Sequence, residues 1–255
     1  MLATQRKQEI VDRIERTGGV VAAELASEWG VSEDTIRRDL RELSAASKVH
    51  RVHGGAVSVS PAAGDYSTRE TVALGSKTEV AEAAVGLIKP GQTVFLDGGT
   101  TTAAICRSLP TAMELTIVTH SPTVAVELIE RPAIQVMLIG GMLYRHSIVA
   151  VGAMTAEYIS TLNIDTFFMG VSGVHADHGL TTGDAEEAAI KRAICARAAD
   201  CYVLASSEKF GSALPFRVVD FDDVTAAITD ESDPETLESL QQAGLKVIKT
   251  GVDSK

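Results

Sequence analysis

The chain has 255 residues, of which 45% are apolar and 22% are charged, a composition typical of a globular protein with one large or two smaller domains. No apolar run reaches the roughly 18 to 20 residues of a membrane helix, and the first residues lack the apolar segment of a signal peptide. We therefore expect a soluble, cytoplasmic protein. The three cysteines, Cys106, Cys195 and Cys201, form no C-x-x-C pair, which argues against a disulfide framework and a structural zinc site.

The net charge of -11 is unevenly distributed along the chain. Residues 1 to 57 hold nine basic and nine acidic residues, so the entire net charge lies beyond residue 57. This asymmetry predicts an amino-terminal domain over residues 1–59 and a larger domain over residues 76–255. The linker between them, residues 60–75, begins with small and polar residues broken by Pro61. Because the first domain is neutral overall, any DNA affinity must come from the local arrangement of its arginines.

Apolar spacing and capping residues predict three helices in the first domain. The first covers residues 3–16, with apolar residues at positions 10, 11 and 14, and ends at two glycines. The second covers residues 21–29 and stops at Gly30, after which Ser32 is placed as the N-cap of the third. Ala26 permits a close helix crossing, and Gly30 can adopt a left-handed conformation. We interpret the segment as a helix-turn-helix.

The third helix has two unlike faces. Ile36, Leu40 and Leu43 are spaced to pack inward. The opposite face, at i, i+3, i+4 and i+7, suits phosphates and guanine edges and consists of Asp34, Arg37, Arg38 and Arg41. The alternative is a solvated face whose arginines are balanced by Asp34, Asp39 and Glu42. The helix-turn-helix spacing favours a helix that enters the DNA major groove.

A basic wing is predicted after the third helix. Residues 48–53 and 56–59 form two short extended runs around a Gly-Gly turn. Lys48, Arg51 and His53 lie in the first run, from which they can reach the DNA backbone or the minor groove. Trp29, the single tryptophan, is expected to be a partly buried packing residue.

The string V-S-E-D-T-I-R-R-D-L over residues 31–40, followed by H-G-G-A over residues 53–56, closely resembles the DNA-binding segment of the DeoR/GlpR family of bacterial transcription regulators. The resemblance implies a winged helix that binds operator DNA. The residues expected to contact DNA are Ser32, Asp34, Thr35, Arg37, Arg38, Arg41, Lys48, Arg51 and His53.

The larger domain alternates strand-like runs with helical stretches. Seven runs are apolar and short, at residues 93–96, 115–118, 136–139, 167–169, 201–204, 226–228 and 247–248. Helices lie between them, one of which is expected over residues 185–199. This alternation predicts an α/β domain with a mostly parallel sheet. In such sheets, ligands bind beyond the carboxyl ends of the strands.

Several of these strand ends carry glycine or hydroxyl residues that suit a phosphate. The first strand runs into Asp97-Gly98-Gly99-Thr100-Thr101-Thr102, where glycines permit close approach and a helix begins. Lysines 191 and 209 could neutralise the anion as point charges. The residues expected to bind the effector are Asp97, Gly98, Gly99, Thr100, Thr101, Thr102, Thr119, His120, Ser121, Gly140, Gly141, Lys191 and Lys209.

These motifs, together with Gly179-Leu180-Thr181 and Lys209-Phe210-Gly211, also resemble the DeoR-type sensor domain. That domain is itself similar to ribose-5-phosphate isomerase, which implies a phosphorylated sugar as effector, with the Gly98 to Thr102 turn on the phosphate. Two positions depart from the family pattern. His120 stands where asparagine is frequent, and Ser206-Ser207-Glu208-Lys209 lacks a frequent aspartate. A satisfied structural histidine is the favoured interpretation of His120, and a pH-dependent phosphate contact is the alternative.

Three alternatives compete with a regulator. A sugar-phosphate isomerase needs a carboxylate base, yet residues 167–173 lack the acidic run of those enzymes, although Asp97, Asp184, Glu186 or Glu187 could substitute. A metal site at His175, Asp177 and His178 is disfavoured against a solvated turn, because no regular element aims these side chains. A protein-binding winged helix is disfavoured by the lack of exposed aromatic anchors near the arginines.

We therefore predict a transcriptional regulator that is not an enzyme and needs neither a cofactor nor a metal. Its expected action is repression of carbohydrate catabolism or uptake genes, relieved by a phosphorylated sugar or polyol. Its expected partners are double-stranded operator DNA and this effector, with no membrane. Because one winged helix reads only a few base pairs, a homodimer or homotetramer is expected.

Overall fold

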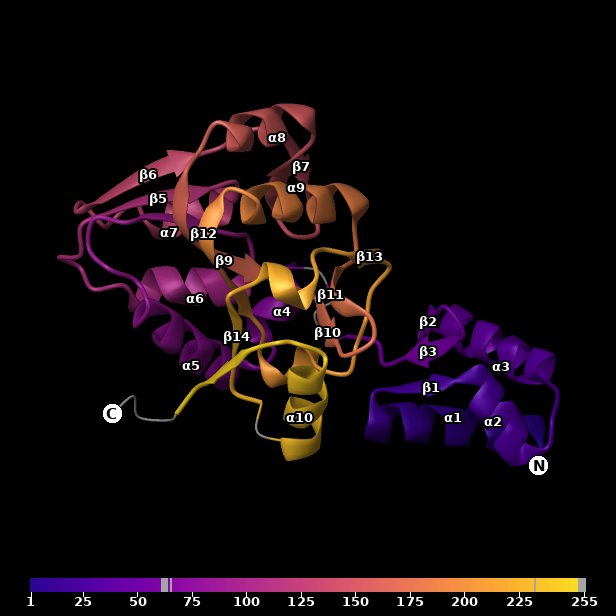
Figure 1. The fold of residues 1–255 in the computed structure, drawn as a ribbon. Coiled ribbons are helices and arrows are strands. Elements are labelled where there is room, and N and C mark those ends of the chain that lie inside the picture. Colours follow the sequence, from indigo (N-terminus) through magenta and orange to yellow (C-terminus); the bar gives the residue numbers. More distant parts are fainter. Residues whose placement is uncertain (61–63, 65, 232, 252–255) are drawn as a thin grey trace.

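A computed structural model describes residues 1–60, 64, 66–231 and 233–251 of the chain. It consists of a small helical unit that contains the amino terminus and a larger α/β unit (Figure 1). Residues 61–63 and 65 of the expected linker, and residues 232 and 252–255 of the expected second domain, lie outside the described residues.

The small unit is a winged helix. Its elements in chain order are α1 (Ala3–Thr17), β1 (Gly19–Val21), α2 (Ala22–Trp29), α3 (Glu33–Ala45), β2 (His50–Val52) and β3 (Gly55–Val57). The three expected helices and the two wing strands are confirmed in place. Ile10, Leu25, Ile36 and Leu40 are buried together at the centre of the three helices. Gly30 adopts the expected left-handed conformation, with φ of 64°.

Strand β1 occupies residues that the sequence pattern assigned to a turn and to the start of the second helix. It pairs antiparallel with β3, which gives the sheet order β1-β3-β2. The strand forms because its backbone finds partners in a distant segment, which local periodicity does not reveal. Gly55 makes this pairing possible, since a Cβ atom there would lie 1.9 Å from the carbonyl oxygen of Val20.

All seven strand-like runs of the larger unit lie in one parallel sheet of order β15-β14-β12-β9-β4-β5-β6, which confirms the predicted sheet. The strands are β4 (Thr93–Leu96), β5 (Leu115–Thr119), β6 (Ile134–Leu138), β9 (Ile164–Gly170), β12 (Ala198–Leu204), β14 (Ala226–Thr229) and β15 (Val247–Lys249). Because the order places β4 and β9 in the middle of the sheet, their carboxyl ends lie side by side at the centre of the end where the parallel strands terminate.

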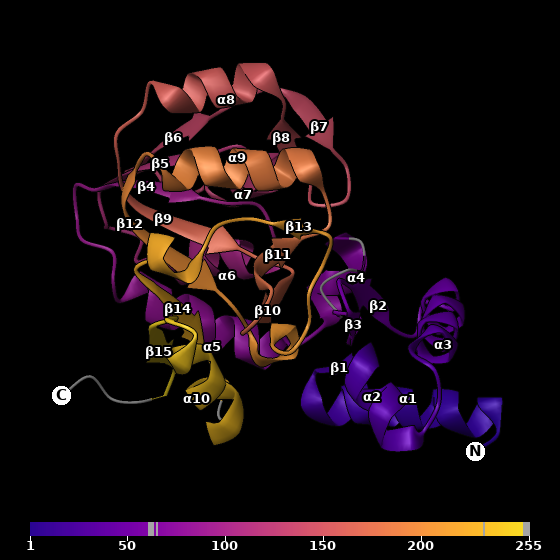
Figure 2. The same ribbon diagram turned by 45° about the vertical axis from the view of Figure 1, so that its right-hand side comes forward.

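Helices cover both faces of the sheet (Figure 2). One face carries α5 (Leu74–Val85), α6 (Thr100–Ser108) and α7 (Pro122–Glu127), and the other carries α8 (Ala153–Ser160) and α9 (Ala185–Cys195), with α10 (Pro234–Gln242) near β14. Phe95 and Phe168 are fully buried, on opposite faces of neighbouring strands. The helix expected over residues 185–199 ends earlier, at Cys195, because β12 pairs with β9 from Ala198 onward.

Several small elements outside the large sheet were not expected. They are helix α4 (Tyr66–Thr71), the hairpin of β7 (Met142–Tyr144) and β8 (Val149–Val151), the antiparallel set β10 (Gly173–His175), β11 (Gly179–Thr182) and β13 (Phe216–Arg217), and two 3-10 turns, η2 (Ser207–Lys209) and η3 (Phe221–Asp223). Helix α4 lies within the segment interpreted as an exposed linker. Among the described residues, no helix is long and apolar enough to cross a membrane.

Candidate DNA-binding surface and effector pocket

Helix α3 presents its arginines to solvent. Ser32 caps the helix, because its hydroxyl accepts a hydrogen bond from the Thr35 backbone N–H at 3.2 Å. The side chains expected to point inward, Ile36, Leu40 and Leu43, are buried, and the side chains of Asp34, Arg37, Arg38 and Arg41 are exposed. The two predicted faces of the helix are therefore present.

The acidic residues near these arginines do not neutralise them uniformly. Asp39 is buried and accepts a hydrogen bond from the Arg6 guanidinium of α1 at 2.5 Å, which raises the pKa of Arg6. Glu42 is paired with Lys7 of α1. Arg37 forms an ion pair with Glu33 at 2.6 Å, whereas none of the ion pairs among the described residues engages Arg38 or Arg41. Two arginines thus remain available to an external anion.

The wing adds further cations beside α3 (Figure 1). Lys48, Arg51 and His53 are exposed, and Gly54 turns the hairpin with φ of 81°. Thr35 is half-buried next to the cap. The residues expected to contact DNA therefore lie on α3 and the adjacent β2–β3 hairpin, an arrangement that fits a winged helix on DNA. Trp29 is half-buried and packs against Arg13, as expected, with the guanidinium 5.6 Å from the ring centre.

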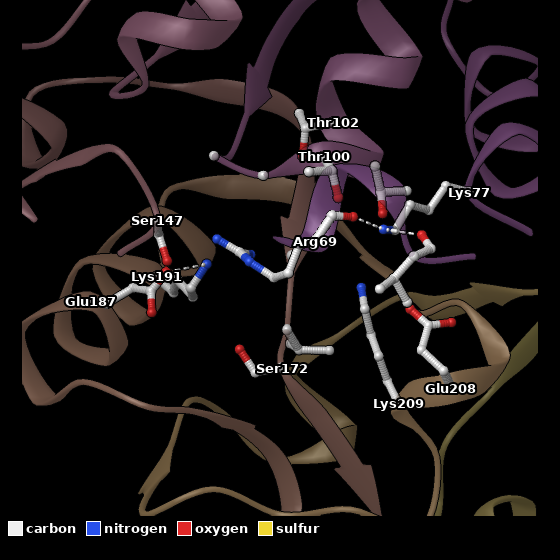
Figure 3. A pocket seen from close by; sticks show the side chains of 16 residues that line it. Arg69, Lys77, Thr100, Thr102, Ser147, Ser172, Glu187, Lys191, Glu208 and Lys209 are labelled. Atoms are coloured by element: carbon white, nitrogen blue, oxygen red, sulfur yellow. Dashed lines mark hydrogen bonds and ion pairs between the residues drawn. The ribbon is translucent and has the colours of Figure 1, made fainter. Parts of the chain in front are cut away.

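A pocket lies at the carboxyl end of the central strands of the large sheet. It is open to solvent at its mouth. Figure 3 shows basic side chains converging on it from several elements. Its lining comprises Arg69, Val72, Lys77, Gly98, Gly99, Thr100, Thr101, Thr102, Ser147, Gly170, Val171, Ser172, Glu187, Lys191, Glu208 and Lys209.

The turn after β4 forms one wall of this pocket. Gly99 has φ of 128° and precedes α6 without any side-chain cap, so the first N–H groups and the positive end of α6 face the pocket. A Cβ atom on Gly98 would lie 2.1 Å from the Val149 side chain, which makes glycine necessary there. The three threonines that follow add hydroxyl groups. This wall has the chemistry of a phosphate site.

Four cations line the pocket, and three of them, Lys77, Lys191 and Lys209, are almost completely buried. Lys191 pairs with Asp97 beneath the pocket floor and lies 3.6 Å from Glu187. Lys209 donates a hydrogen bond to the Leu204 carbonyl at 2.9 Å, and burial lowers its pKa to about 8. With its positive charge opposed by burial, Lys209 would gain most from an incoming anion.

The other two cations precede the first strand of the large sheet, Arg69 in α4 and Lys77 in α5. Arg69 donates to the His146 carbonyl at 2.9 Å, while its buried Nε atom has no hydrogen-bond partner. Lys77 donates to the carbonyls of Arg69 and Val72. Against these four cations, the lining offers only Glu187 and Glu208 as anions. A net positive pocket with unmet donors favours an anionic ligand.

Asp97 is fully buried below the pocket and does not line it. Its carboxylate accepts hydrogen bonds from four groups, the backbone N–H groups of Gly98 and Gly170 and the side chains of His120 and Lys191. Burial raises the pKa of Asp97, but the Lys191 charge and the His120 hydrogen bond outweigh it and hold that pKa well below its usual range. With every acceptor site of the carboxylate occupied, Asp97 positions Lys191 and the Gly98 turn.

His120 is also fully buried, which agrees with the structural role favoured from the sequence. Its Nδ1 atom lies 2.8 Å from the Ala150 carbonyl and its Nε2 atom lies 2.9 Å from Asp97. Both neighbours are hydrogen-bond acceptors. The histidine thereby connects β5, β8 and the carboxylate under the pocket floor.

The remaining residues expected at the effector site lie outside the pocket lining. Thr119 and Ser121 are fully buried, and the Ser121 hydroxyl donates to the Ile148 carbonyl at 3.0 Å. Gly140 and Gly141 lie at the start of the β7–β8 hairpin, where the Gly140 carbonyl accepts from Thr155 at 3.0 Å. The structure thus brings together the Gly98 to Thr102 turn, Lys191 and Lys209, but not Asp97, Thr119, His120, Ser121, Gly140 or Gly141.

Sequence reasoning missed six polar side chains of the pocket lining: Arg69, Lys77, Ser147, Ser172, Glu187 and Glu208. Ser172 belongs to a glycine-rich strand end, and Glu187 lies one helical turn before Lys191, so these two carried a sequence signal. Arg69 and Lys77 carried none, because they precede the first strand of the domain and reach the pocket only through the folding of α4 and α5.

The other reactive side chains are two histidines, one at the end of β10 and one in the loop that follows it, and three cysteines. The rings of His175 and His178 lie 4.7 Å apart, and the described residues contain no group of three or more His, Cys, Asp or Glu that could hold a metal ion. All three cysteines are free thiols, with Cys106 and Cys201 buried.

Comparison with known proteins assigns both units. A model of the DeoR-like helix-turn-helix domain matches residues 6–62, and a model of the DeoR C-terminal sensor domain matches residues 73–231. The chain is 34% identical over 251 residues to the HTH-type transcriptional regulator GlpR of Haloferax volcanii, covering 97% of this chain and 98% of that protein. It is 31% identical to the glycerol-3-phosphate regulon repressor of Escherichia coli K12, covering 92% and 93%.

Among solved structures, ribose 5-phosphate isomerase A from Methanocaldococcus jannaschii overlaps 52% of this chain and 53% of that chain, with 18% identity and a TM-score of 0.39. This overlap carries no functional argument. The two family models, by contrast, together cover most of the chain, and the two named regulators match this chain over nearly their full length. The chain therefore belongs to the DeoR family of transcriptional regulators and is not an enzyme.

Proposed function

We propose that this regulator is a repressor of carbohydrate catabolism or uptake genes that is released from operator DNA by a phosphorylated sugar or polyol. Helix α3 would enter the major groove, and the wing would contact the DNA backbone or minor groove. The observation that supports the DNA contact is the exposed face of α3, on which Arg38 and Arg41 have no carboxylate partner among the described ion pairs.

The pocket supports the anionic effector. Four cations, three threonines and the start of α6 line the pocket. A phosphate would occupy the Gly98 to Thr102 wall, and the sugar or polyol would extend toward Ser172 and Glu187. The name of one relative, a glycerol-3-phosphate regulon repressor, agrees with an effector of this class.

Fluorescence anisotropy on DNA from upstream of the protein's own gene would test the DNA contact. Arg38→Ala should cost about 1–3 kcal/mol of operator binding and reduce the salt dependence. Arg16→Ala is the matched control, because Arg16 is an exposed arginine of α1 and belongs neither to α3 nor to the wing. Equal affinity of the folded Arg38→Ala variant and the control would remove Arg38 from the interface.

The same titration, repeated with a panel of sugar phosphates and glycerol 3-phosphate, would test the pocket. Thr101→Val replaces one hydroxyl of the phosphate wall with a methyl group of similar size. We expect this variant to bind operator normally and to lose release by the effector. Because linkage is reciprocal, operator DNA should weaken effector binding by the same factor as effector weakens DNA binding. Normal release of Thr101→Val would contradict the assignment.

The DNA contact implies a homo-oligomer. A single winged helix reads too few base pairs for a useful specificity, so the regulator would act as a dimer or tetramer on repeated half-sites. The larger domain would assemble the oligomer, since it provides most of the accessible surface away from α3.

A further inference from the structure

One edge of the large sheet is uncharged. Strand β6 forms that edge, and no residue from position 132 to 144 is charged, although 22% of the whole chain is. The opposite edge strand, β15, is flanked and ended by the exposed lysines 246 and 249. Proteins normally protect free edge strands with charges of this kind, because an unprotected edge pairs with other strands. Only one of the two edges of this sheet is protected in that way.

Exposed apolar side chains surround the uncharged edge. We define the edge patch as Leu138, Met142, Leu143, Met154 and Tyr158, all of which are exposed, with Met142 at 77% and Met154 at 80%. Tyr158 of α8 reaches β6, because its hydroxyl contacts the Met137 sulfur at 3.7 Å. β6, β7 and α8 lie together at the end of the larger unit that is far from α3 (Figures 1 and 2).

We propose that the edge patch is the surface on which a second copy of this chain docks, with β6 pairing against β6 of the partner. Five side chains that each expose about 100–150 Å² provide on the order of 600 Å² per protomer, close to the ~800 Å² of a standard interface. A two-fold axis perpendicular to β6 pairs the two strands antiparallel and brings like apolar surfaces together, with no charge in residues 132–144 to desolvate. The choice of a second copy rests on the proposed function, which requires two recognition helices.

Sedimentation velocity of the full chain without DNA or effector tests this surface. We expect the wild-type protein to sediment as a dimer or larger assembly, and Met142→Lys and Leu138→Lys each to lose one association step. Leu74→Lys is the control, because Leu74 is an exposed leucine of α5 outside the patch. A monomeric wild-type protein, or patch variants with unchanged mass, would overturn the proposal. Neither result depends on DNA binding, so a failed DNA assay would remain distinguishable.

A different observation concerns the contact between the winged helix and the larger unit. Gly18, which ends α1, and Gly211 pack backbone to backbone, so that a Cβ atom on Gly18 would lie 2.9 Å from the Gly211 Cα atom. The Ser58 hydroxyl donates to the Gly211 carbonyl at 3.2 Å. A second connection runs from Ser60 to the carbonyl of Ser172, which lines the pocket.

The same short segment that touches the winged helix also holds a pocket lysine. Lys209 lies in the pocket two residues before Gly211, and its carbonyl accepts from the Ser212 hydroxyl at 2.8 Å. Gly211 donates its N–H to the Val174 carbonyl at 3.0 Å. A displacement of Lys209 would therefore be transmitted through two residues of backbone to Gly18 and Ser58.

We infer that residues 207–212 form the coupling segment between the pocket and the winged helix. A phosphate in the pocket would attract the Lys209 ammonium group, which donates only one of its three N–H groups to the Leu204 carbonyl, and would draw it toward the Gly98 to Thr102 wall. The lysine then moves, and Gly211 moves with it relative to Gly18. This inference rests on the proposed function, and it specifies how that pocket is read by the DNA-binding unit.

Hydrogen exchange of the full chain tests the coupling without any ligand. The Ser58 amide donates to the Gly18 carbonyl at 3.1 Å and reports the contact. Lys209→Met removes the bond to Leu204, and Gly211→Ala disturbs the packing on Gly18, so each should raise exchange at Ser58 about threefold or more. Gly91→Ala is the control, because Gly91 has φ of 81° and open space around a Cβ atom.

The outcomes separate this inference from the proposed function. Faster exchange at Ser58 in Lys209→Met and Gly211→Ala, but not in Gly91→Ala, supports the coupling segment whether or not the protein binds the chosen DNA. Unchanged exchange at Ser58 in both variants would overturn it. Where the wild-type protein binds operator, both variants should also change operator affinity in the absence of effector, while the control should not.

Discussion

The state of Lys209 makes a quantitative prediction for effector binding. Burial lowers the pKa of this lysine to about 8, and Glu208 raises it only in part, while Lys77, Arg69 and Lys191 lower it further. A free protein at neutral pH therefore carries a charged but poorly solvated ammonium group in the pocket. A dianionic phosphate would stabilise that charge, so effector affinity should fall as the pH rises through 8.

The size of the effect follows from the titration. With a pKa of about 8, roughly nine in ten protein molecules hold a charged Lys209 at pH 7 and roughly one in ten at pH 9. If the effector binds only the charged form, its Kd should rise about tenfold between these pH values, or about 1.4 kcal/mol. Lys191 contributes nothing in this window, because Asp97 and Glu187 overcome burial and raise its pKa above the usual value.

The same shift fixes the sign of a stability effect. The folded-state pKa of Lys209 is lowered, so the charged lysine destabilises the folded chain below about pH 8. That cost is relieved as the pH rises from about 8 toward the unfolded value of 10.5. Effector binding should therefore stabilise the protein more at pH 7 than at pH 9.

Isothermal titration calorimetry with the sugar phosphate or glycerol 3-phosphate that releases operator would measure this dependence at constant ionic strength. A phosphate monoester is a dianion throughout the range, since its second pKa is about 6. Lys209→Arg is the control, because arginine stays charged and should bind with a Kd independent of pH. A wild-type Kd that is constant from pH 7 to pH 9 would refute the role of Lys209.

Three further predictions concern stability and the wing. Lys191→Met should lower the free energy of unfolding by about 3–5 kcal/mol in urea, because it leaves Asp97 buried without its cation, and the double variant with Asp97→Asn should lose less than the two single variants combined. Arg6→Met should also destabilise the winged helix, because it leaves the buried Asp39 carboxylate without its cation. The loss in free energy of unfolding, followed by tryptophan fluorescence, should be smaller than for Lys191→Met; unchanged unfolding would show that this pair is not needed. Gly55→Ala should abolish operator binding while the circular dichroism of the larger unit persists, since a Cβ atom would collide with strand β1; normal operator affinity would contradict the tight pairing.

The local sequence determined the three helices of the winged helix and the seven strands of the large sheet. Strands such as Thr93–Leu96 are apolar on both sides and short, which identifies them without knowledge of their neighbours. Ser32 is an N-cap residue that predicts the start of helix α3. The i, i+3, i+4 spacing of Asp34, Arg37 and Arg38 places these side chains on one face of any helix. The phosphate wall after β4 was recognisable for the same reason, because its glycines and threonines are consecutive residues.

Only the tertiary structure decided which polar residues meet. Asp97 and His120 lie at strand ends where a ligand was expected, yet the fold surrounds them with protein donors and acceptors and buries them beneath the pocket. Asp39 directly follows the exposed Arg38 in the sequence, but successive residues of a helix point in different directions, and the Asp39 side chain points toward Arg6.

Arg69 lines the pocket, although it lies in residues 60–75, which the sequence pattern predicts to be a linker. Its position depends on contacts over more than seventy residues, such as its hydrogen bond to the His146 carbonyl. Periodicity, capping and turn chemistry act over a few residues, so they determine the helices of the winged helix and the strands of the large sheet. The pairing of charges, and with it the composition of the pocket, depends on distances that exist only once those elements have packed.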